Sequence, residues 1–183
     1  MFNVVKNKGN IVKAYKLGDN HPIINKLISE KKIKCLENGK YEVFSQEALN
    51  AGSGHGQIAY AGDYVKIDSS GAPYPNDNEY FITNHKHLEG DEYEQIPKEL
   101  KAWDVNEPMC DEVQFLIDKK GLTLDKSNPE QYYTAPLWGT IESANIDGIL
   151  MFYSITYGID GKVEDAEFNL VNGEEFEKTY NRC

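Results

Sequence analysis

The alternation of apolar and polar positions predicts a β-rich turn region within the first half of the chain. Residues 64–67 alternate with a period of two between Gly62 and Gly71, as expected of a strand bounded by turns. Pro73 and Pro75 follow this segment, and proline cannot donate a ladder hydrogen bond inside a sheet. The pattern therefore excludes a continuing central strand and predicts a short strand followed by a turn.

Two dipeptides predict β-hairpins, because Asn-Gly and Asp-Gly readily adopt the positive φ angles of tight hairpin turns. The dipeptides and the strands that they join are Asn38-Gly39 between 33–36 and 41–44, and Asp160-Gly161 between 149–157 and 163–171. Segment 149–157 is apolar on both faces near its start, which is typical of a central strand covered on each side. Further strands are predicted at 11–17, 57–60 and 138–142.

Helical spacing and capping signals predict two main helices. The first covers 22–31, where Pro22 suits the first turn and apolar residues recur on one face. The second covers 108–119, with Asn106 as its N-cap and Gly121 as its stop. A short helix is also predicted after Pro75.

These elements predict an α+β fold, with a mostly antiparallel β-sheet and two main helices. Residues 1–95 form a β-rich half with one helix, and residues 107–183 form a half with one helix and a hairpin. Residues 96–106 are irregular in pattern, with Trp103 as their one large anchor, so we expect a connector there. The two halves are either one domain or two small subdomains.

Composition limits the function classes. The chain has 183 residues and a formal net charge of −11, from 30 acidic and 19 basic side chains. This charge repels nucleic-acid phosphates and anionic lipids, so neither nucleic acid nor a membrane is an expected partner. The longest strongly apolar run, 149–153, is too short to span a bilayer, and we expect a cytoplasmic protein. The three cysteines are expected to be reduced thiols: Cys35, Cys110 and Cys183.

Four segments of the chain resemble small phage- and prophage-associated proteins of unknown function. The matching segments are Val12-Lys13-Ala14, Gly62-Asp63-Tyr64-Val65, Gly71-Ala72-Pro73-Tyr74-Pro75 and Phe176-Glu177-Lys178-Thr179-Tyr180. The resemblance covers roughly the first half, and the closing Phe-x-x-Thr-Tyr lies far downstream of its place in that pattern. It implies a β-rich bacterial or phage accessory protein and carries no known activity.

Two histidines form the sharpest chemical candidate. His85 and His87 lie two positions apart, so on a strand both imidazoles lie on one face, and Glu92 supplies a carboxylate. Two histidines and one carboxylate are a common divalent-metal site. The glycines of a cupin-type metal motif are missing, since Glu79 and Glu99 stand in their places. A solvated loop is therefore the simpler interpretation of this segment.

A glycine-dense loop presents a further histidine. His55 lies between Gly54 and Gly56 and is a candidate general base or anion contact. Glycine-rich phosphate loops lead into a helix and carry a basic residue. This loop leads instead into the predicted strand 57–60 and carries neither lysine nor arginine, so the pattern favours a flexible connector.

Aromatic residues are a more general signal, because tyrosine and tryptophan often anchor binding surfaces. The candidates are Tyr64, Tyr74, Trp138 and Tyr153, although most aromatics of a β-rich domain lie in its core. Acidic residues are spread along the chain rather than gathered in one block, which indicates a solvated acidic surface.

Three functions follow from these patterns. The first is an acidic, cytoplasmic, non-enzymatic protein that uses no cofactor and binds another protein, in phage biology, bacterial defence or toxin immunity. The second is a small metal-dependent enzyme that uses His85, His87 and a nearby carboxylate, with His55 as proton carrier. The third is a small-ligand-binding module with an aromatic pocket near residues 54–64.

Overall fold

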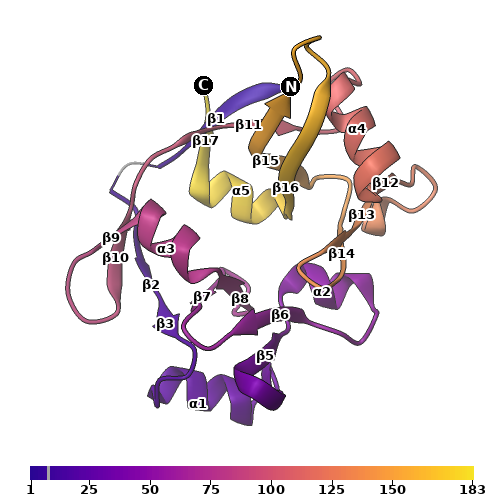
Figure 1. Cartoon of the computed structure of the whole chain (residues 1–183). Helices are drawn as coiled ribbons and strands as arrows, with labels where there is room; N and C mark the ends of the chain where they lie inside the picture. Colours follow the sequence, from indigo (N-terminus) through magenta and orange to yellow (C-terminus); the bar gives the residue numbers. More distant parts are fainter. Residues whose placement is uncertain (8) are drawn as a thin grey trace.

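The computed structural model of the protein describes residues 1–7 and 9–183. Short strands and short helices follow each other along the chain, and every strand pair among these residues is antiparallel (Figure 1). The α+β class with mostly antiparallel sheet is therefore confirmed. The strands form one five-stranded sheet and four three-stranded sheets within the described part of the chain.

The five-stranded sheet has the order β16-β15-β11-β1-β17. Its strands are β1 (Phe2–Lys6), β11 (Glu99–Trp103), β15 (Ile149–Tyr157), β16 (Val163–Val171) and β17 (Tyr180–Arg182). On β15, Leu150 and Phe152 pack into one hydrophobic cluster while Ile149 and Met151 pack into another. Successive strand residues point to opposite faces, so this apolar run covers both sides of the sheet, as predicted.

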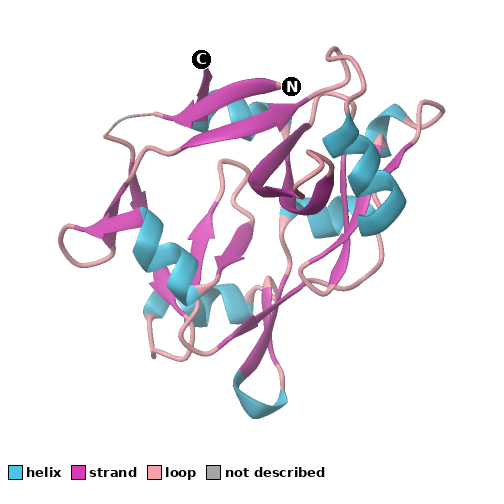
Figure 2. Cartoon of the chain, turned by 45° about the horizontal axis from the view of Figure 1, so that its top comes forward, coloured by secondary structure: helices cyan, strands magenta, loops and turns pink. Residues whose placement is uncertain are grey.

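The other strands form small sheets, three strands each. Their orders are β2-β10-β9, β12-β13-β14, β3-β7-β8 and β4-β5-β6. The bounds are β2 (Ile11–Lys13), β3 (Tyr15–Lys16), β4 (Ile33–Cys35), β5 (Lys40–Val43), β6 (Gln57–Tyr60), β7 (Tyr64–Ile67), β8 (Pro73–Asn76), β9 (His85–His87), β10 (Glu92–Gln95), β12 (Thr123–Leu124), β13 (Tyr133–Leu137) and β14 (Thr140–Ala144). Figure 2 shows the five-stranded sheet at one end of the molecule, with the short sheets and the helices around the remainder.

The helices are short, and side chains cap several of them. They are α1 (Pro22–Ser29), α2 (Gln46–Ala51), α3 (Asn78–Asn84), α4 (Asp111–Lys120) and α5 (Gly173–Thr179), with 3-10 turns at Glu37–Gly39 and Pro129–Gln131. Ser45 caps α2 by accepting from the Ala48 amide, and Asp77 caps α3 by accepting from the Tyr80 amide. Gly121 ends α4 in the left-handed conformation, as its sequence predicts.

Both predicted hairpins are confirmed. Strands β4 and β5 pair around Asn38 and Gly39, whose φ angles are 59° and 70°. Strands β15 and β16 have the predicted bounds and pair across the predicted turn. Pro73 and Pro75 lie in β8, which is an edge strand, in agreement with the missing proline donor.

The prediction of an irregular connector is wrong for its central residues. Residues 99–103 form β11, which lies between β1 and β15 in the five-stranded sheet. Leu100 and Ala102 are buried while Glu99 and Lys101 are exposed, so this segment does alternate. That sheet combines strands from all three predicted segments, which the sequence did not indicate.

Other boundaries also differ from the predictions. The strand expected at 11–17 is two strands in different sheets, separated by the buried Ala14, whose amide donates to the Asp91 carbonyl over 3.0 Å. Helix α4 begins at Asp111, since the Trp103 indole donates to the Pro108 carbonyl and holds the preceding residues in a turn. Helices α2 and α5 were not predicted.

Candidate functional site

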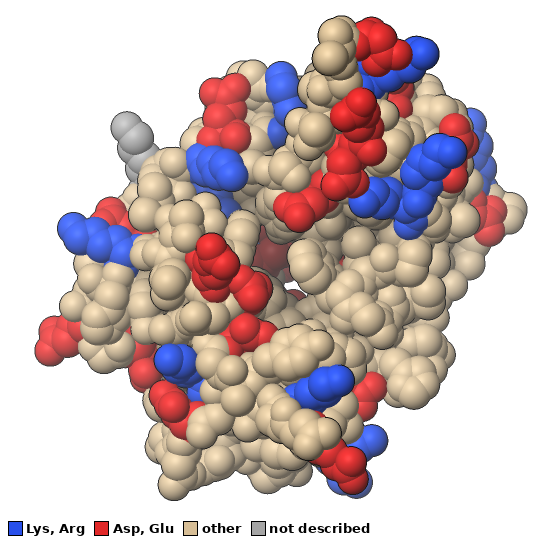
Figure 3. Space-filling view, in the orientation of Figure 1, with Lys and Arg blue, Asp and Glu red and all other residues tan. Residues whose placement is uncertain are grey.

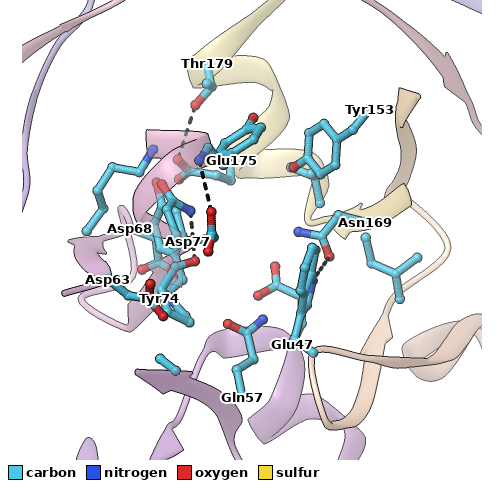
Figure 4. A pocket seen from close by; sticks show the side chains of 18 of the residues that line it. Glu47, Gln57, Asp63, Asp68, Tyr74, Asp77, Tyr153, Asn169, Glu175 and Thr179 are labelled. Atoms are coloured by element: carbon cyan, nitrogen blue, oxygen red, sulfur yellow. Dashed lines mark hydrogen bonds between the residues drawn. The ribbon is translucent and has the colours of Figure 1, made fainter. Parts of the chain in front are cut away.

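A cavity of about 520 Å³ lies between the five-stranded sheet and the small sheets β3-β7-β8 and β4-β5-β6. In the space-filling view the molecule is hollowed at its centre, and carboxylate side chains lie around the opening (Figure 3). Figure 4 shows side chains that converge on it from β6, β7, β8, α2, α5, β15 and β16. Sites for small organic ligands typically have volumes of about 300–1,000 Å³.

The β7-β8 hairpin forms one wall. Lys66 on β7 is directly opposite Tyr74 on β8, and the Lys66 Nζ lies 5.1 Å from the centroid of the Tyr74 ring. The turn between the strands is held by Asp68, whose Oδ1 accepts from the Ser70 and Ala72 amides at 2.8 and 2.9 Å. This local geometry places a lysine and a tyrosine side by side on the cavity surface.

The opposite wall comes from the long hairpin and contains a β-bulge. The register of β15 against β16 shifts between Phe152 and Ser154, so Tyr153 is the extra residue. A bulge redirects a side chain and is frequent next to functional sites. Here Tyr153 points into the cavity beside Asn169 of β16 (Figure 4).

Trp138 lies on the same side and has an unusual backbone. It occupies the β13-β14 turn with a φ of 52°, a conformation that bulky residues rarely adopt. Its Nε1 donates to the Asn169 Oδ1 over 3.2 Å, and half of the residue is exposed. Positive φ angles at Trp138 and Gly139 are what the two-residue hairpin turn between β13 and β14 requires, and for a bulky residue they cost on the order of 1 kcal/mol.

Two lysines line the cavity without carboxylate partners. Lys6 is 8 % and Lys66 is 5 % exposed, and no ion pair joins either one to a carboxylate within residues 1–7 and 9–183. Burial lowers the pKa of Lys6 to about 8. Burial, together with the nearby Lys6 ammonium, holds the pKa of Lys66 well below its usual value.

Carboxylates occupy other parts of the lining. Glu47 on α2 accepts from the Asn172 side-chain amide over 2.9 Å, and burial raises its pKa to about 7. Glu175 on α5 accepts from the Thr179 hydroxyl at 3.2 Å and from the Ser69 amide at 3.3 Å. The cavity lining therefore includes one carboxyl group, Glu47, with a raised pKa and two amines, Lys6 and Lys66, with lowered pKa values.

Two buried acceptors near the cavity lack protein donors. The Oδ1 atom of Asn76, which lines the cavity, has no hydrogen-bond partner among the described residues. Behind the wall, Glu142 is fully buried, its Oε1 accepts from Gln57, and its Oε2 has no partner among the same residues. Burial raises the pKa of Glu142 to about 8, so this carboxyl is mostly protonated at neutral pH.

Of the four aromatic candidates, three lie together at this site. Tyr74, Trp138 and Tyr153 all line the cavity. Tyr64 does not line it, since its ring stacks on Phe81 at a centroid distance of 4.1 Å.

The histidine candidates do not gather in one place. His85 is 5 % exposed, stacks on Phe81 at 4.0 Å, and donates from Nδ1 to the Phe81 carbonyl at 2.9 Å. Burial lowers the pKa of His85 to about 3, so its ring is neutral. His87 and Glu92 are exposed, and the His87 Nε2 is bonded to the Gly90 carbonyl. No group of three or more His, Cys, Asp or Glu side chains suited to a metal ion occurs in the described part of the chain.

His55 lies outside the cavity. Its side chain is 77 % exposed, and its Nδ1 is 3.4 Å from Glu42 Oε1. Glu42 also accepts from the Gly56 amide at 3.0 Å, so these contacts fasten the glycine-rich loop to β5.

Sequence patterns missed the charged half of the site. Lys6 and Glu47 come from segments for which no functional role was predicted, and Glu175 was considered only as part of a dispersed acidic surface. The sequence did carry a signal for Lys66, because this lysine lies within an alternating strand and lysine is rarely buried without a specific role. No comparable signal marks the other three.

Comparisons with known proteins add no relative. A scan against protein-family models, a search of curated proteins and a search of solved structures each found no match. Within the described residues, no helix has both the length and the apolar character needed to cross a bilayer.

Proposed function

We propose that the protein binds a small, uncharged, polar organic molecule in the central cavity. The observation that carries this proposal is one enclosure of about 520 Å³ that residues from both halves of the chain line with aromatic rings, amides and ionisable groups. Concave surfaces on which polar groups converge beside apolar and aromatic faces are typical of small-molecule sites. The cavity includes Gln57 to Tyr60, beside which a ligand pocket was expected.

The lining favours hydroxyl and carbonyl groups on the ligand. Tyr74, Tyr80 and Tyr153 supply flat faces and hydroxyl groups, and Asn76 and Asn169 supply side-chain amides. Tyrosine hydroxyls and side-chain amides can both donate and accept, so they can pair with the hydroxyl and carbonyl groups of a ligand. Aromatic faces beside amides suit molecules with both C–H faces and hydroxyl groups, such as sugars and polyols.

The charge around the cavity disfavours phosphorylated ligands. Six acidic residues line it against two lysines; the acids are Glu47, Asp63, Asp68, Asp77, Glu167 and Glu175. Like charges repel most strongly where solvent is excluded. A neutral ligand is therefore expected to bind better than its phosphorylated counterpart.

The other two functions have less support. For protein recognition, Figure 3 shows acidic side chains dispersed over the visible face together with lysines, rather than gathered in one patch. For metal catalysis, His85 is buried against Phe81 while His87 is exposed, so the two rings have different surroundings. The cavity is the more specific observation.

Fluorescence titration tests the proposal. Trp138 lies in the cavity lining and is half exposed, whereas Trp103 is buried in the core, so bound ligand should change mainly the Trp138 emission. We expect at least one member of a panel of monosaccharides, polyols and small hydroxyaldehydes to give a saturable change. Its phosphorylated counterpart should bind about tenfold more weakly or worse, equivalent to about 1.4 kcal/mol.

A pair of asparagine variants locates the binding. Asn76→Leu replaces a polar side chain of the cavity lining by an apolar one, and the affinity should fall about tenfold, as for one lost hydrogen bond. Asn78→Leu is the matched control, because Asn78 is exposed two positions further along and does not line the cavity. Equal affinities of the two variants would contradict the proposed location.

A further inference from the structure

We propose that Lys66 reacts through its Nζ with the carbonyl carbon of a small hydroxylated aldehyde or ketone in the cavity and forms an imine. This inference rests on the proposed function, since it names the reactive group of the ligand that the cavity holds. It is carried by the position of the buried Lys66 amine, opposite Tyr74 on the β7-β8 hairpin and on the surface of a cavity large enough for a ligand.

The placement of Lys66 is unusual for a lysine. Fully buried lysines are rare unless they are paired, yet this one is 5 % exposed and has no carboxylate within ion-pair distance among the described residues. Its Nζ lies over the Tyr74 ring, and it lines the cavity rather than the hydrophobic core. A structural role would be served as well by an apolar side chain at this position.

The surroundings favour the neutral, nucleophilic form of the amine. The titratable groups near Lys66 are Lys6, Tyr74, Glu175 and His85. Burial and the Lys6 ammonium lower the pKa of Lys66, whereas Glu175 opposes this effect more weakly. A desolvated lysine beside a second cationic group is a known way to activate an amine for imine formation.

The reaction needs no oxidant or metal. The Nζ lone pair attacks the carbonyl carbon, the carbonyl oxygen takes up a proton, and the nitrogen loses one, which gives a carbinolamine. The hydroxyl group then leaves as water with a second proton from the nitrogen, and a carbon–nitrogen double bond remains. Glu175 is the nearby carboxylate that can accept the proton from nitrogen and return it to the departing oxygen.

Reductive trapping tests this proposal. Protein at pH 7 is incubated with glycolaldehyde or glyceraldehyde and sodium cyanoborohydride, which reduces imines to stable amines, and peptide masses then locate the adduct. Because exposed lysines have a pKa near 10.4, only about 0.04 % of each is neutral at this pH. We expect Lys66 to be labelled at least about 100-fold faster than an exposed lysine such as Lys98. It should also be labelled faster than Lys6, which lines the same cavity but with a pKa of about 8 is mostly protonated at pH 7.

Three variants separate reactivity from folding. Lys66→Met should lose the fast adduct while keeping the cooperative unfolding transition, and Lys98→Met should label like the parent protein. Lys6→Met should slow labelling several-fold, because removal of the like charge leaves more of Lys66 protonated. Uniform slow labelling of many lysines, with no excess at Lys66, would overturn the inference.

The result also distinguishes this inference from the proposed function. Saturable binding of a polyol without any excess label at Lys66 leaves the cavity a ligand site and refutes the imine. Absence of binding by every member of the panel refutes the proposed function, and the imine falls with it. Fast labelling of Lys66 that an unreactive bound polyol prevents supports both.

Discussion

Replacing Phe81 by alanine is expected to lower the free energy of unfolding by about 3–5 kcal/mol. Phe81 is fully buried on α3 and lies among three other rings. Its centroid distances are 4.1 Å to Tyr64, 4.0 Å to His85 and 4.9 Å to Tyr93. The variant loses the transfer free energy of a large side chain and leaves a cavity between α3, β7 and two other strands.

Chemical denaturation of Phe81→Ala beside Ile82→Ala measures this effect. Ile82 is the next residue of the same helix and is 57 % exposed, so its truncation should change stability by no more than about 0.5 kcal/mol. Helix α3 also carries Tyr80 into the cavity, so Phe81→Ala should weaken ligand binding as well. A loss below about 1 kcal/mol for Phe81→Ala would mean that this aromatic cluster is not packed as described.

Replacing Glu142 by glutamine is expected to stabilise the protein at alkaline pH. The folded-state pKa of Glu142 is about 8, whereas an unfolded glutamate titrates near 4.3. The raised value means that stability is fully present below about pH 4.3 and is lost as the pH rises through 8. Glutamine resembles the protonated acid and can still accept from Gln57, but it does not ionise.

The difference between the two proteins should therefore depend on pH. We expect little difference in unfolding free energy near pH 4.5, and a gain for Glu142→Gln on the order of 4 kcal/mol at pH 9. Glu164→Gln is the control, because Glu164 is exposed on β16. A constant difference between pH 5 and pH 9 would show that Glu142 does not carry a raised pKa.

Sequence patterns predicted the locally determined parts of the fold. The two hairpins depend on dipeptides whose φ angles are set within the turn, and the Gly121 stop depends on one residue, so each could be recognised without knowledge of the tertiary structure. Strand β11 was missed although Leu100 and Ala102 alternate with charged residues. Its five residues lie between Pro97 and Pro108, and these flanking prolines suggested an irregular segment.

The site was less predictable because its members meet only through the tertiary structure. Tyr74, Trp138 and Tyr153 were selected as aromatic anchors, but their sequence positions do not indicate that they share one cavity. The β-bulge that directs Tyr153 depends on the register of two long strands, which no single segment encodes. The buried state of Lys66 likewise depends on elements from distant parts of the chain.

The cavity and the buried lysine belong to one candidate site. The β7-β8 hairpin presents an amine and a tyrosine, and the bulged hairpin presents a second tyrosine and an amide across the same space. On the proposed function, the acids around the opening are expected to disfavour anionic ligands. Burial of Lys66 without an ion-pair partner among the described residues has a cost for stability, which is expected where a residue serves binding.

The most direct test is to map bound ligand by amide chemical-shift changes in isotopically labelled protein. We predict that the best ligand from the neutral panel shifts the amides of Lys66, Tyr74, Tyr153 and Asn169 in a saturable manner, and leaves exposed residues such as Lys98 unchanged. Shifts confined to another surface, or no shifts with any member of the panel at millimolar concentration, would contradict the account.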